Sequence, residues 1–354
     1  MNSTWCVLVQ KKEGEKLRQW LITKSLLDRN LKIESDNEWL IFPIIRELDA
    51  SEHSILLNLL ENVRFERRKM QNRDLKKPGD LFSAIKQSIP EKLHSYIPKS
   101  FDIIGKLVIL EIPEELEKFQ NFIGQTLLNL HPSLSSVFKK LEPIKGEYRL
   151  RHHELIAGED NSITIHKENN CMYELDIQKV YFSPRLATEH VRVNSQVDKD
   201  ELILDMFTGI GPFSILIAKE KQAHVFAVDI NPDAIYYLKR NIISNKVEGY
   251  VTPLEDNVKE AFKNKNNRRF DRIIMNLPSK SAEFLDTACK VLKEGGVIHF
   301  YQFAPESDIP GQVTKKIQYF IEREGRKIEE IKELRKVRPY APHIWQIGVD
   351  ILIN

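Results

Sequence analysis

The sequence contains few cysteines, and they show no pairing pattern. Cys6, Cys171 and Cys289 lie far apart, without a CxxC spacing or an even-numbered framework. This distribution excludes a disulfide scaffold and argues against structural zinc, and it is typical of a reducing compartment. We therefore expect three core or half-buried thiols and no bound metal.

Long apolar runs and a targeting segment are also lacking. No apolar stretch approaches the roughly 18 residues of a membrane-spanning helix, and no charged-then-apolar leader is visible. These features predict a soluble, cytoplasmic protein with no membrane partner. Repeats and low-complexity tracts are lacking as well. The 354 residues, 42% of them hydrophobic, are therefore expected to form two or three domains.

Positive charge is concentrated in one stretch although the net charge is low. The formal net charge of +2 neither requires nor excludes a polyanionic partner. Residues 64–80 (RFERRKMQNRDLKKPGD) are rich in Lys and Arg and end in Pro78-Gly79. Charge runs of this kind are usually solvated linkers. The alternative is a segment that follows a phosphate backbone.

The N-terminal half shows two successive α+β patterns. Residues 4–10 and 38–45 are predicted to be strands and residues 13–27 an amphipathic helix, which indicates a small α+β domain over residues 1–70. A mixed α+β domain that includes the basic linker is expected over residues 71–195. Its strands are expected within residues 101–113, 148–158 and 162–177, with a hairpin tip at residues 168–170.

Residues 196–354 alternate between strand and helix patterns, which predicts a parallel sheet with crossover helices. The first four strands end in turn at Asp205, Asp229, Asp256 and Asn276, and residues 292–303 supply a helix end, a turn and a fifth strand. Ligands bind beyond the carboxyl ends of the strands in open α/β sheets. The four polar side chains are therefore expected to converge on one crevice.

A glycine turn (GIGPF) follows the first of these strands. Gly209 and Gly211 let a ligand approach the backbone closely, but the third glycine of a dinucleotide-binding GxGxxG is lacking. Asp229, about 20 residues later, is placed to accept hydrogen bonds from the ribose hydroxyls of an adenosine moiety. Asp205 would repel a pyrophosphate but suits the ammonium or sulfonium of S-adenosylmethionine. This pattern resembles the class I methyltransferases.

The fourth strand ends in Asn276-Leu277-Pro278. This element resembles the Asn/Asp-x-Pro strand end with which methyltransferases acting on nucleic-acid nitrogens hold the target base. The alternative is that Asn276 caps the helix expected at about residue 281. The resemblance to methyltransferases implies the following cofactor-binding residues: Asp205, Phe207, Gly209, Gly211, Asp229, Ile230, Asp256, Asn276 and Pro278.

Several blocks along the chain are similar to one family. YFSPRLATEHVRV (residues 181–193), KGEYRLRHHELIAGE, TIHKEN, DMFTGIGPFSI, DINPDAI and MNLP resemble, in order, the archaeal and eukaryotic tRNA methyltransferases that modify N1 of guanosine 37, 3′ of the anticodon. The N-terminal module fits the archaeal three-domain form. The resemblance implies S-adenosylmethionine as cofactor and tRNA as partner. It also implies that the N-terminal module reads tRNA shape and is dispensable for cofactor binding.

The resemblance also assigns catalytic roles. Glu189 would be the general base that removes the N1 proton, Arg185 would stabilise the charge that spreads to O6, Asn276 would fix the base, and Arg149 would organise the site. A carboxylate is a weak base unless burial raises its pKa, so Glu189 is expected in a partly desolvated pocket. From spacing alone, Arg185 and Glu189 would be an ordinary helical ion pair.

The remaining candidates are substrate-binding residues. They are Tyr181, His190, Pro278, Arg67 and Arg68, the last two as tRNA phosphate contacts. Tyr181 has a core position as its alternative. His190 stands where the family has an arginine, which puts tRNA affinity or rate in doubt but not the reaction type.

Three further residues near the C-terminus, Arg338, Tyr340 and His343, either line the substrate face or belong to a loop before the last strand.

Two other functions stay open at this point. One is a related aminocarboxypropyl transferase of tricyclic-guanosine (wyosine) biosynthesis, which uses the same cofactor. The other is a non-catalytic tRNA-binding protein with a degenerate methyltransferase fold. The sequence contains nothing that resembles a dedicated oligomer interface, so we expect a monomer.

Overall fold

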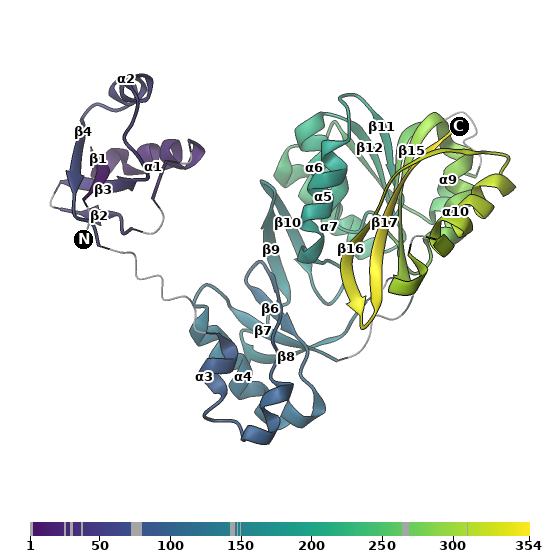
Figure 1. The fold of residues 1–354 in the computed structure, drawn as a ribbon, viewed down its shortest axis with the longest axis horizontal. Helices are drawn as coiled ribbons and strands as arrows, with labels where there is room; N and C mark the ends of the chain where they lie inside the picture. Colours follow the sequence, from purple (N-terminus) through teal and green to yellow (C-terminus); the bar gives the residue numbers. More distant parts are fainter. Residues whose placement is uncertain are drawn as a thin grey trace. The chain divides into compact units, whose positions relative to one another are not determined.

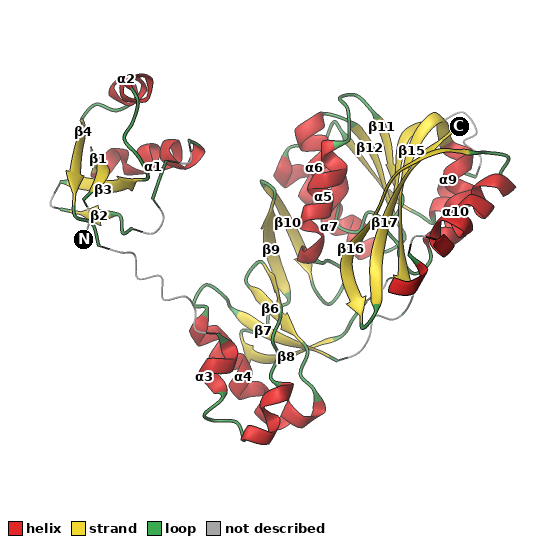
Figure 2. Cartoon of the chain, in the orientation of Figure 1, coloured by secondary structure: helices red, strands yellow, loops and turns green. Residues whose placement is uncertain are grey.

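The computed structural model describes residues 3–24, 26–28, 31–36, 38–71, 80–141, 146, 148, 150–263, 269–309 and 311–354. The chain divides into two compact units, Met1–Asp80 and Leu81–Asn354, which Figures 1 and 2 show with the labels used below.

The first unit is a four-stranded antiparallel sheet with two helices. The strand order is β2-β3-β1-β4. Its elements are β1 (Thr4–Gln10), a 3₁₀ turn η1 (Lys11–Glu13), α1 (Gly14–Thr23), β2 (Glu34–Ser35), β3 (Trp39–Ile44), α2 (Ala50–Leu59) and β4 (Val63–Arg68). Leu17 and Leu21, one helical turn apart on α1, are buried against Val7, Val9 and Phe42 of the sheet. The predicted α+β module is present, but its first helix ends at Thr23 rather than at residue 27.

The basic stretch begins in this sheet. Strand β4 pairs with β1 along its length, with Arg67 opposite Trp5 and Arg68 opposite Thr4. The Arg67 guanidinium lies 5.2 Å from the centre of the Trp5 ring, a cation–π contact. The linker interpretation is therefore wrong for residues 64–68. Residues 72–79 lie outside the described part of the chain.

The second unit begins with a mixed four-stranded sheet, in the order β5-β6-β7-β8. Its elements are α3 (Leu81–Ile85), η2 (Glu91–Tyr96), β5 (Asp102–Ile104), β6 (Leu107–Leu110), η3 (Glu114–Phe119), α4 (Gln120–Leu130), β7 (Ser136–Lys140) and β8 (His153–Gly158). Gly105 turns the chain between β5 and β6 with a φ of +57°, a conformation that favours glycine.

A two-stranded hairpin connects this sheet to the rest of the unit. It consists of β9 (Ile163–Glu168) and β10 (Cys171–Asp176), with Asn169 and Asn170 at positive φ in the predicted tip. Asn241 and Asn245, one turn apart on helix α7 (Pro232–Asn245), bond to the backbone of β10 at 2.7–3.1 Å. These amides satisfy the free edge of β10 and fix the hairpin to the C-terminal layer.

The C-terminal part is a seven-stranded sheet, in the order β13-β12-β11-β14-β15-β17-β16. The first five strands are parallel and β17 is antiparallel to both neighbours. The strands are β11 (Leu202–Asp205), β12 (His224–Asp229), β13 (Val251–Glu255), β14 (Phe270–Met275), β15 (Leu292–Pro305), β16 (Ile328–Ala341) and β17 (Ile344–Ile353). The order reverses at β11, which places a ligand crevice at its carboxyl end.

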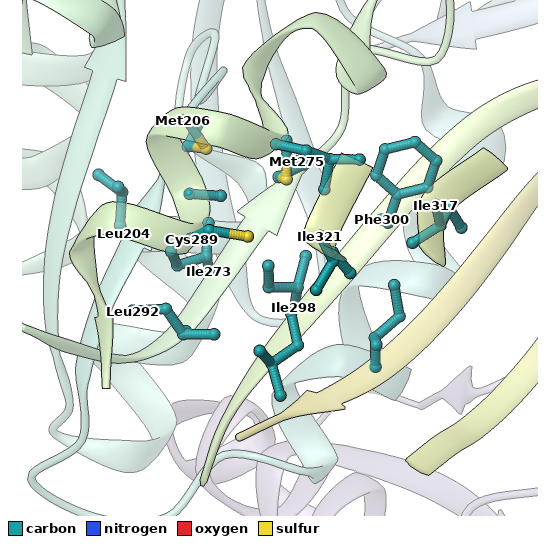
Figure 3. Close-up of a cluster of buried hydrophobic side chains, with 14 of the residues drawn as sticks. Leu204, Met206, Ile273, Met275, Cys289, Leu292, Ile298, Phe300, Ile317 and Ile321 are labelled. Atoms are coloured by element: carbon teal, nitrogen blue, oxygen red, sulfur yellow. The ribbon is translucent and has the colours of Figure 1, made fainter. Parts of the chain in front are cut away.

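Helices cover both faces of this sheet. They are η4 (Pro184–Leu186), α5 (Ala187–Ser195), α6 (Pro212–Lys221), α7 (Pro232–Asn245), α8 (Val258–Ala261), η5 (Ser281–Phe284), α9 (Leu285–Val291), η6 (Glu306–Asp308) and α10 (Gly311–Arg323). In Figure 1, α5–α7 lie on one side of the sheet and α9 and α10 on the other. Figure 3 shows the core under α9 and α10, where Cys289, Ile317 and Ile321 pack on Ile298 and Phe300 of β15.

The C-terminal hairpin differs from expectation. Arg338 and Tyr340 lie on β16, so the predicted loop is wrong for them. Only His343, at a φ of +58°, is in the turn between β16 and β17. The three cysteines are free and buried.

Candidate functional site

A cavity of about 410 Å³ lies at the carboxyl ends of β11, β12 and β14. Its size suits a small-molecule ligand. The predicted residues that line it are Tyr181, His190, Phe207, Gly209, Asp229, Ile230, Asp256, Asn276 and Pro278. Four others lie outside its lining: Arg185, Glu189, Asp205 and Gly211. The strand ends therefore converge as the sequence predicted, with the exception of Asp205.

The two glycines of the turn have different tasks. Gly209, at a φ of +55°, lies at the cavity surface, and an added Cβ would meet only the Tyr181 carbonyl oxygen, at 3.8 Å. Gly211, at a φ of +93°, immediately precedes helix α6, and a Cβ there would lie 2.5 Å from Leu238 Cδ1. Gly209 thus leaves room for a ligand, whereas Gly211 lets α6 pack against α7.

Asp229 is held in place by backbone donors. Its two carboxylate oxygens accept hydrogen bonds from the backbone N–H groups of Gly209 at 2.8 Å and Asn231 at 2.9 Å. Burial raises the pKa of Asp229, and these hydrogen bonds oppose the rise. The fixed carboxylate keeps lone pairs for the two hydroxyls of a ribose.

Asp205 lies behind the cavity wall and is fully buried. Its Oδ2 accepts a hydrogen bond from Ser214 Oγ at 2.8 Å, while its Oδ1 has no hydrogen-bond partner among the described residues. Burial raises the pKa of Asp205 to about 6. A buried carboxylate with an unpaired oxygen suits a nearby cationic ligand, whose charge would favour the ionised form. The residues present therefore fit S-adenosylmethionine, with Asp205 acting through its charge.

Asn276 does not cap a helix. Ser281 ties the strand end to the following turn, because its hydroxyl accepts from Leu277 N–H at 3.2 Å and donates to the Met275 carbonyl at 2.8 Å. The Asn276 side chain instead accepts a hydrogen bond from Gln346 Nε2 at 3.1 Å. The capping alternative for Asn276 is therefore wrong, and Asn276 is part of the cavity lining together with Gln346.

Arg338 joins three parts of that wall. It donates from Nε to Gln346 Oε1 at 2.7 Å, from Nη1 to Ser183 Oγ at 2.9 Å and from Nη2 to the Tyr181 hydroxyl at 2.9 Å. All four residues line the cavity, so Tyr181 is not a core residue. Gln346 and Ser183 were not identified from the sequence. YFSP carries Ser183 in a family motif, but Gln346 has no sequence signal.

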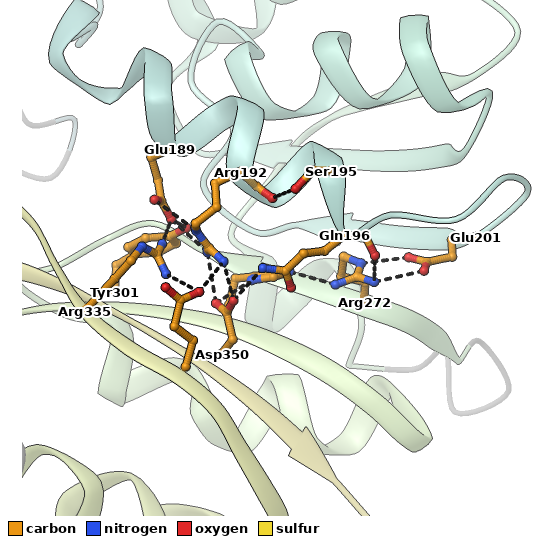
Figure 4. Close-up of polar contacts among 11 residues, drawn as sticks. Glu189, Arg192, Ser195, Gln196, Glu201, Arg272, Tyr301, Arg335 and Asp350 are labelled. Atoms are coloured by element: carbon orange, nitrogen blue, oxygen red, sulfur yellow. Dashed lines mark hydrogen bonds and ion pairs between the residues drawn. The ribbon is translucent and has the colours of Figure 1, made fainter.

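Glu189 belongs to a buried polar network, shown in Figure 4. Arg192 donates to both of its oxygens, at 3.2 and 3.0 Å, and Tyr301 and Arg335 also donate to it. Arg192 and Arg335 are in turn paired with Asp350 and Glu333, respectively. The network joins helix α5 to the three C-terminal strands of the sheet.

The expected rise in the pKa of Glu189 is wrong for this structure. The side chain is buried, and burial alone would raise its pKa, but the hydrogen bonds and charges of Arg192, Tyr301 and Arg335 outweigh burial and lower it. The alternative ion pair with Arg185 is also wrong, because Arg185 Nε pairs with Asp102 at 2.6 Å. Arg185 lines a second, smaller cavity of about 170 Å³ instead.

His190 is separate from this network and lines the first cavity. Its Nδ1 donates to Glu168 Oε1 at 2.6 Å. The centre of its ring lies 4.5 Å from the centre of the Phe213 ring, and the two rings are nearly perpendicular. Burial opposes ionisation of Glu168, but hydrogen bonds from His166 and His190 lower its pKa to about 2. Glu168 was not identified as a site residue, although the TIHKEN block contains it.

Some predicted positions are separate from the cavity or undescribed. Arg149 lies outside the described residues. Arg67 and Arg68 belong to the first unit. Within the described ranges, no cluster of three His, Cys, Asp or Glu side chains could hold a metal ion. None of the helices described is long and apolar enough to cross a membrane.

The sheet order, the glycine turn and the strand-end acids define a class I methyltransferase. Comparison with family models refines this class. Residues 164–329 match the TRM5/TYW2 methyltransferase domain, residues 81–161 the TYW2 N-terminal domain, and residues 6–52 the tRNA methyltransferase 5 N-terminal domain. The chain belongs to the TRM5/TYW2 family of tRNA-modifying enzymes, and the predicted family is confirmed.

Individual relatives agree with this assignment. A tRNA (guanine(37)-N(1))-methyltransferase Trm5b of Pyrococcus abyssi is 40% identical over 351 residues, 99% of each chain. A solved complex of aTrm5 and tRNALeu has a TM-score of 0.69 at 36% identity and covers 99% of both chains. A tRNA(Phe) (4-demethylwyosine(37)-C(7)) aminocarboxypropyltransferase of Pyrococcus horikoshii is 32% identical over 275 residues, 76% of this chain and 94% of its own.

Proposed function

We propose that this protein is an S-adenosylmethionine-dependent methyltransferase that modifies N1 of guanosine 37 in tRNA. One observation carries the proposal. The acid suited to a ribose, Asp229, and the strand-end amide suited to a target base, Asn276, line the same cavity. The full-length relative named as a tRNA (guanine(37)-N(1))-methyltransferase supports the same function.

The residues proposed to hold the cofactor come from the ends of four strands, β11 to β14. Asp229 and Asp256 are proposed to lie on the ribose side of the cofactor, and Phe207 and Gly209 are proposed to contact it from the glycine turn. Asp205 is proposed to act through its charge on the cationic end of the cofactor. Ile230, Asn276 and Pro278 complete the proposed set, and Gly211 contributes to it indirectly, by letting α6 pack against α7 behind the turn. When bound, S-adenosylmethionine supplies an electrophilic methyl group, and the role of these residues is to position it beside the base.

Glu189 remains the proposed general base, because guanine N1 carries a proton that must leave before the nitrogen can attack. The carboxylate is occupied by Arg192, Tyr301 and Arg335, and these contacts make it a weaker base. Arg192 Nη2, Tyr301 and Arg335 all donate to Oε1, whereas Oε2 accepts from Arg192 Nε at 3.2 Å, so Oε2 is the oxygen proposed to accept the N1 proton.

Arg185 is proposed to stabilise the negative charge that develops at O6. Arg149 is proposed to help organise the site. In this structure Arg185 is bonded to Asp102, so it must leave that partner to reach a base in the larger cavity. Asn276 already lines that cavity and is proposed to hold the base.

The tRNA contacts proposed outside the cavity are Arg67 and Arg68, together with the N-terminal module. Tyr181, His190 and Pro278 are proposed to contact the target nucleotide. The three-domain division at residues 70 and 195 and the monomeric, cytoplasmic state stay predictions. Size-exclusion chromatography with light scattering would test the monomer.

The main alternative is aminocarboxypropyl transfer from the same cofactor. The transferase of Pyrococcus horikoshii aligns with 76% of this chain, whereas residues 6–52 match an N-terminal domain of tRNA methyltransferase 5. The presence of that domain favours methyl transfer to guanosine 37.

The test is direct. Purified protein, S-adenosylmethionine and a tRNA transcript with guanosine at position 37 are incubated, and the modified nucleoside is identified by mass spectrometry. A transcript with adenosine at that position is the matched control. The proposal expects N1-methylguanosine in the first transcript only. An aminocarboxypropyl adduct, or no product despite cofactor binding, would contradict it.

A further inference from the structure

A continuous chain of polar side chains runs along the wall of the larger cavity. Arg338 on β16 contacts Tyr181, Ser183 and Gln346, and Gln346 on β17 contacts Asn276 at the end of β14. We refer to Arg338, Gln346 and Asn276 as the amide relay. Its first two members come from the C-terminal hairpin and follow Asn276 by 62 and 70 residues.

The chemistry of the three side chains sets the direction of every bond in the relay. A guanidinium has donors only, so the atom of Gln346 that faces Arg338 must be its oxygen, at 2.7 Å. Gln346 then presents its amino group to Asn276, whose oxygen accepts at 3.1 Å. The amino group of Asn276 is left for a ligand, since no acceptor for it is found among the described residues.

Burial prevents the opposite arrangement. Gln346 is 0% exposed, so water cannot satisfy its amide if it turns over. A reversed Gln346 would place its amino group against the Arg338 guanidinium, where donor meets donor, and its oxygen against Asn276 Oδ1, where acceptor meets acceptor. Buried polar groups left unpaired in this way are strongly disfavoured. The positive charge of Arg338 also polarises the hydrogen bonds of the relay and thereby makes the amino group of Asn276 a stronger donor.

We propose that Arg338 and Gln346 are positioning residues that hold Asn276 as a hydrogen-bond donor toward the target base. This inference rests on the proposed function and deepens it. A donor at this place matches an acceptor on the base edge, which for guanine is O6, next to N1. Adenine carries an amino group there, which would face the amino group of Asn276. The relay therefore selects guanine over adenine and stabilises the negative charge that reaches O6 when N1 loses its proton.

Substitution of Gln346 by Glu tests the direction of the relay with little change in shape. A carboxylate accepts from Arg338 and can only accept from Asn276, so the Asn276 amide must turn and present its oxygen to the base. In single-turnover assays at saturating tRNA and cofactor, Gln346→Glu is expected to lower the methylation rate on guanosine 37 by about 100-fold, in the range of a lost oxyanion donor. Cofactor affinity is expected to fall much less than the rate, since Asp229 and Gly209 are untouched and Asn276 is the one proposed cofactor-binding residue that is reoriented.

Three further variants and one control separate positioning from general structural support. Gln346→Met keeps the volume but makes no hydrogen bond, so Asn276 is free to turn either way and the rate loss should be smaller than with Glu. Arg338→Met should lower kcat more than it raises KM for tRNA, and Arg338→Lys, which restores a donor to Gln346, should recover part of kcat. Lys336→Met, on the same strand but paired with Glu306, is the charge-matched control and should retain wild-type kcat.

The substrate set completes the test. Transcripts with guanosine, inosine and adenosine at position 37 differ in the acceptor at C6 and in the 2-amino group. Inosine keeps O6, so Gln346→Glu should slow guanosine and inosine by the same factor. Wild-type rates in Gln346→Glu, or a rate loss matched by an equal loss of cofactor binding, would overturn the relay while leaving the proposed function in place. A wild-type protein that forms no N1-methylguanosine would overturn the proposed function and the relay with it.

Discussion

The raised pKa of Asp205 makes a specific prediction about stability. The carboxyl is fully buried behind the glycine turn, and one of its oxygens has no partner among the described residues. In the cofactor-free protein its negative charge is therefore poorly compensated. Asp205→Asn removes that charge while keeping the shape and an oxygen that can accept from Ser214.

The magnitude follows from the pKa. Burial raises it from the ordinary 3.8 to about 6, and one pKa unit corresponds to roughly 1.4 kcal/mol. The folded protein binds this proton more tightly than the unfolded chain does, so the free energy of unfolding falls as pH rises through the window from about 4 to 6. Above that window the ionised carboxylate costs roughly 3 kcal/mol, and Asp205→Asn removes this cost.

Denaturant unfolding of the cofactor-free protein at pH 5 and pH 8 measures the effect. When the pH is lowered from 8 to 5, the free energy of unfolding of the wild type should rise by about 1.4 kcal/mol relative to that of Asp205→Asn. A change in hydrogen bonding on substitution shifts both values equally and cancels in the comparison. Asp286→Asn, which changes a solvent-accessible side chain on α9, controls for the loss of one negative charge. If the difference between wild type and Asp205→Asn is the same at both pH values, the account of Asp205 is refuted.

Three further predictions concern packing, the base and tRNA. Gly211→Ala should destabilise the protein by about 1–3 kcal/mol, because its φ is +93° and the new Cβ would lie 2.5 Å from Leu238; an unchanged Tm would contradict this. Glu189→Gln should lower the single-turnover rate by about 100-fold or more while cofactor and tRNA still bind, and a near-normal rate would remove Glu189 from the role of base. Replacing Arg67 and Arg68 together by Ala should weaken tRNA binding and reduce its salt dependence by about one unit of slope per lost phosphate contact; an identical slope would show that neither contacts phosphate.

The parallel part of the fold was predictable because its local patterns agree with its tertiary structure. Strands β11, β12 and β14 carry apolar stretches that a polar residue closes or directly follows, and the carboxyl ends of parallel strands meet at one edge. Asp229 and Asn276 therefore reach the same cavity, as expected. Asp205 is the exception, because the turn that follows it carries Phe207 and Gly209 to the cavity surface and leaves the acid behind the wall.

Strand β4 was missed because charge composition outweighed alternation. In VRFERR, Val63 and Phe65 pack against the core of the first unit, while Arg64 lies over Trp39 at 4.3 Å. This is the period-2 pattern of a half-buried strand. Trp39 lies on β3, which is separated from β4 by β1, and its ring accommodates a guanidinium that would otherwise indicate a solvated linker.

The pKa of Glu189 could not be predicted from its motif. The residues that lower it are Tyr301 and Arg335 in addition to nearby Arg192, and the first two lie more than 100 residues further along the chain. Their approach depends on the pairing of β15, β17 and β16. A motif identifies the carboxylate, but its basicity depends on long-range partners that local patterns do not reveal.

The same limit applies to the strand-end amide, and there it affects specificity as well as reactivity. An Asn-x-Pro element can present either a donor or an acceptor, because the two ends of an amide are nearly the same shape. In this protein the choice is made by Gln346, and the orientation of Gln346 is imposed by Arg338, which has no acceptor to offer. Recognition of O6 rather than a 6-amino group is thus a property of the C-terminal hairpin. A relative with the same strand end but a carboxylate in place of Gln346 should hold its Asn the other way round and prefer a base that presents a donor.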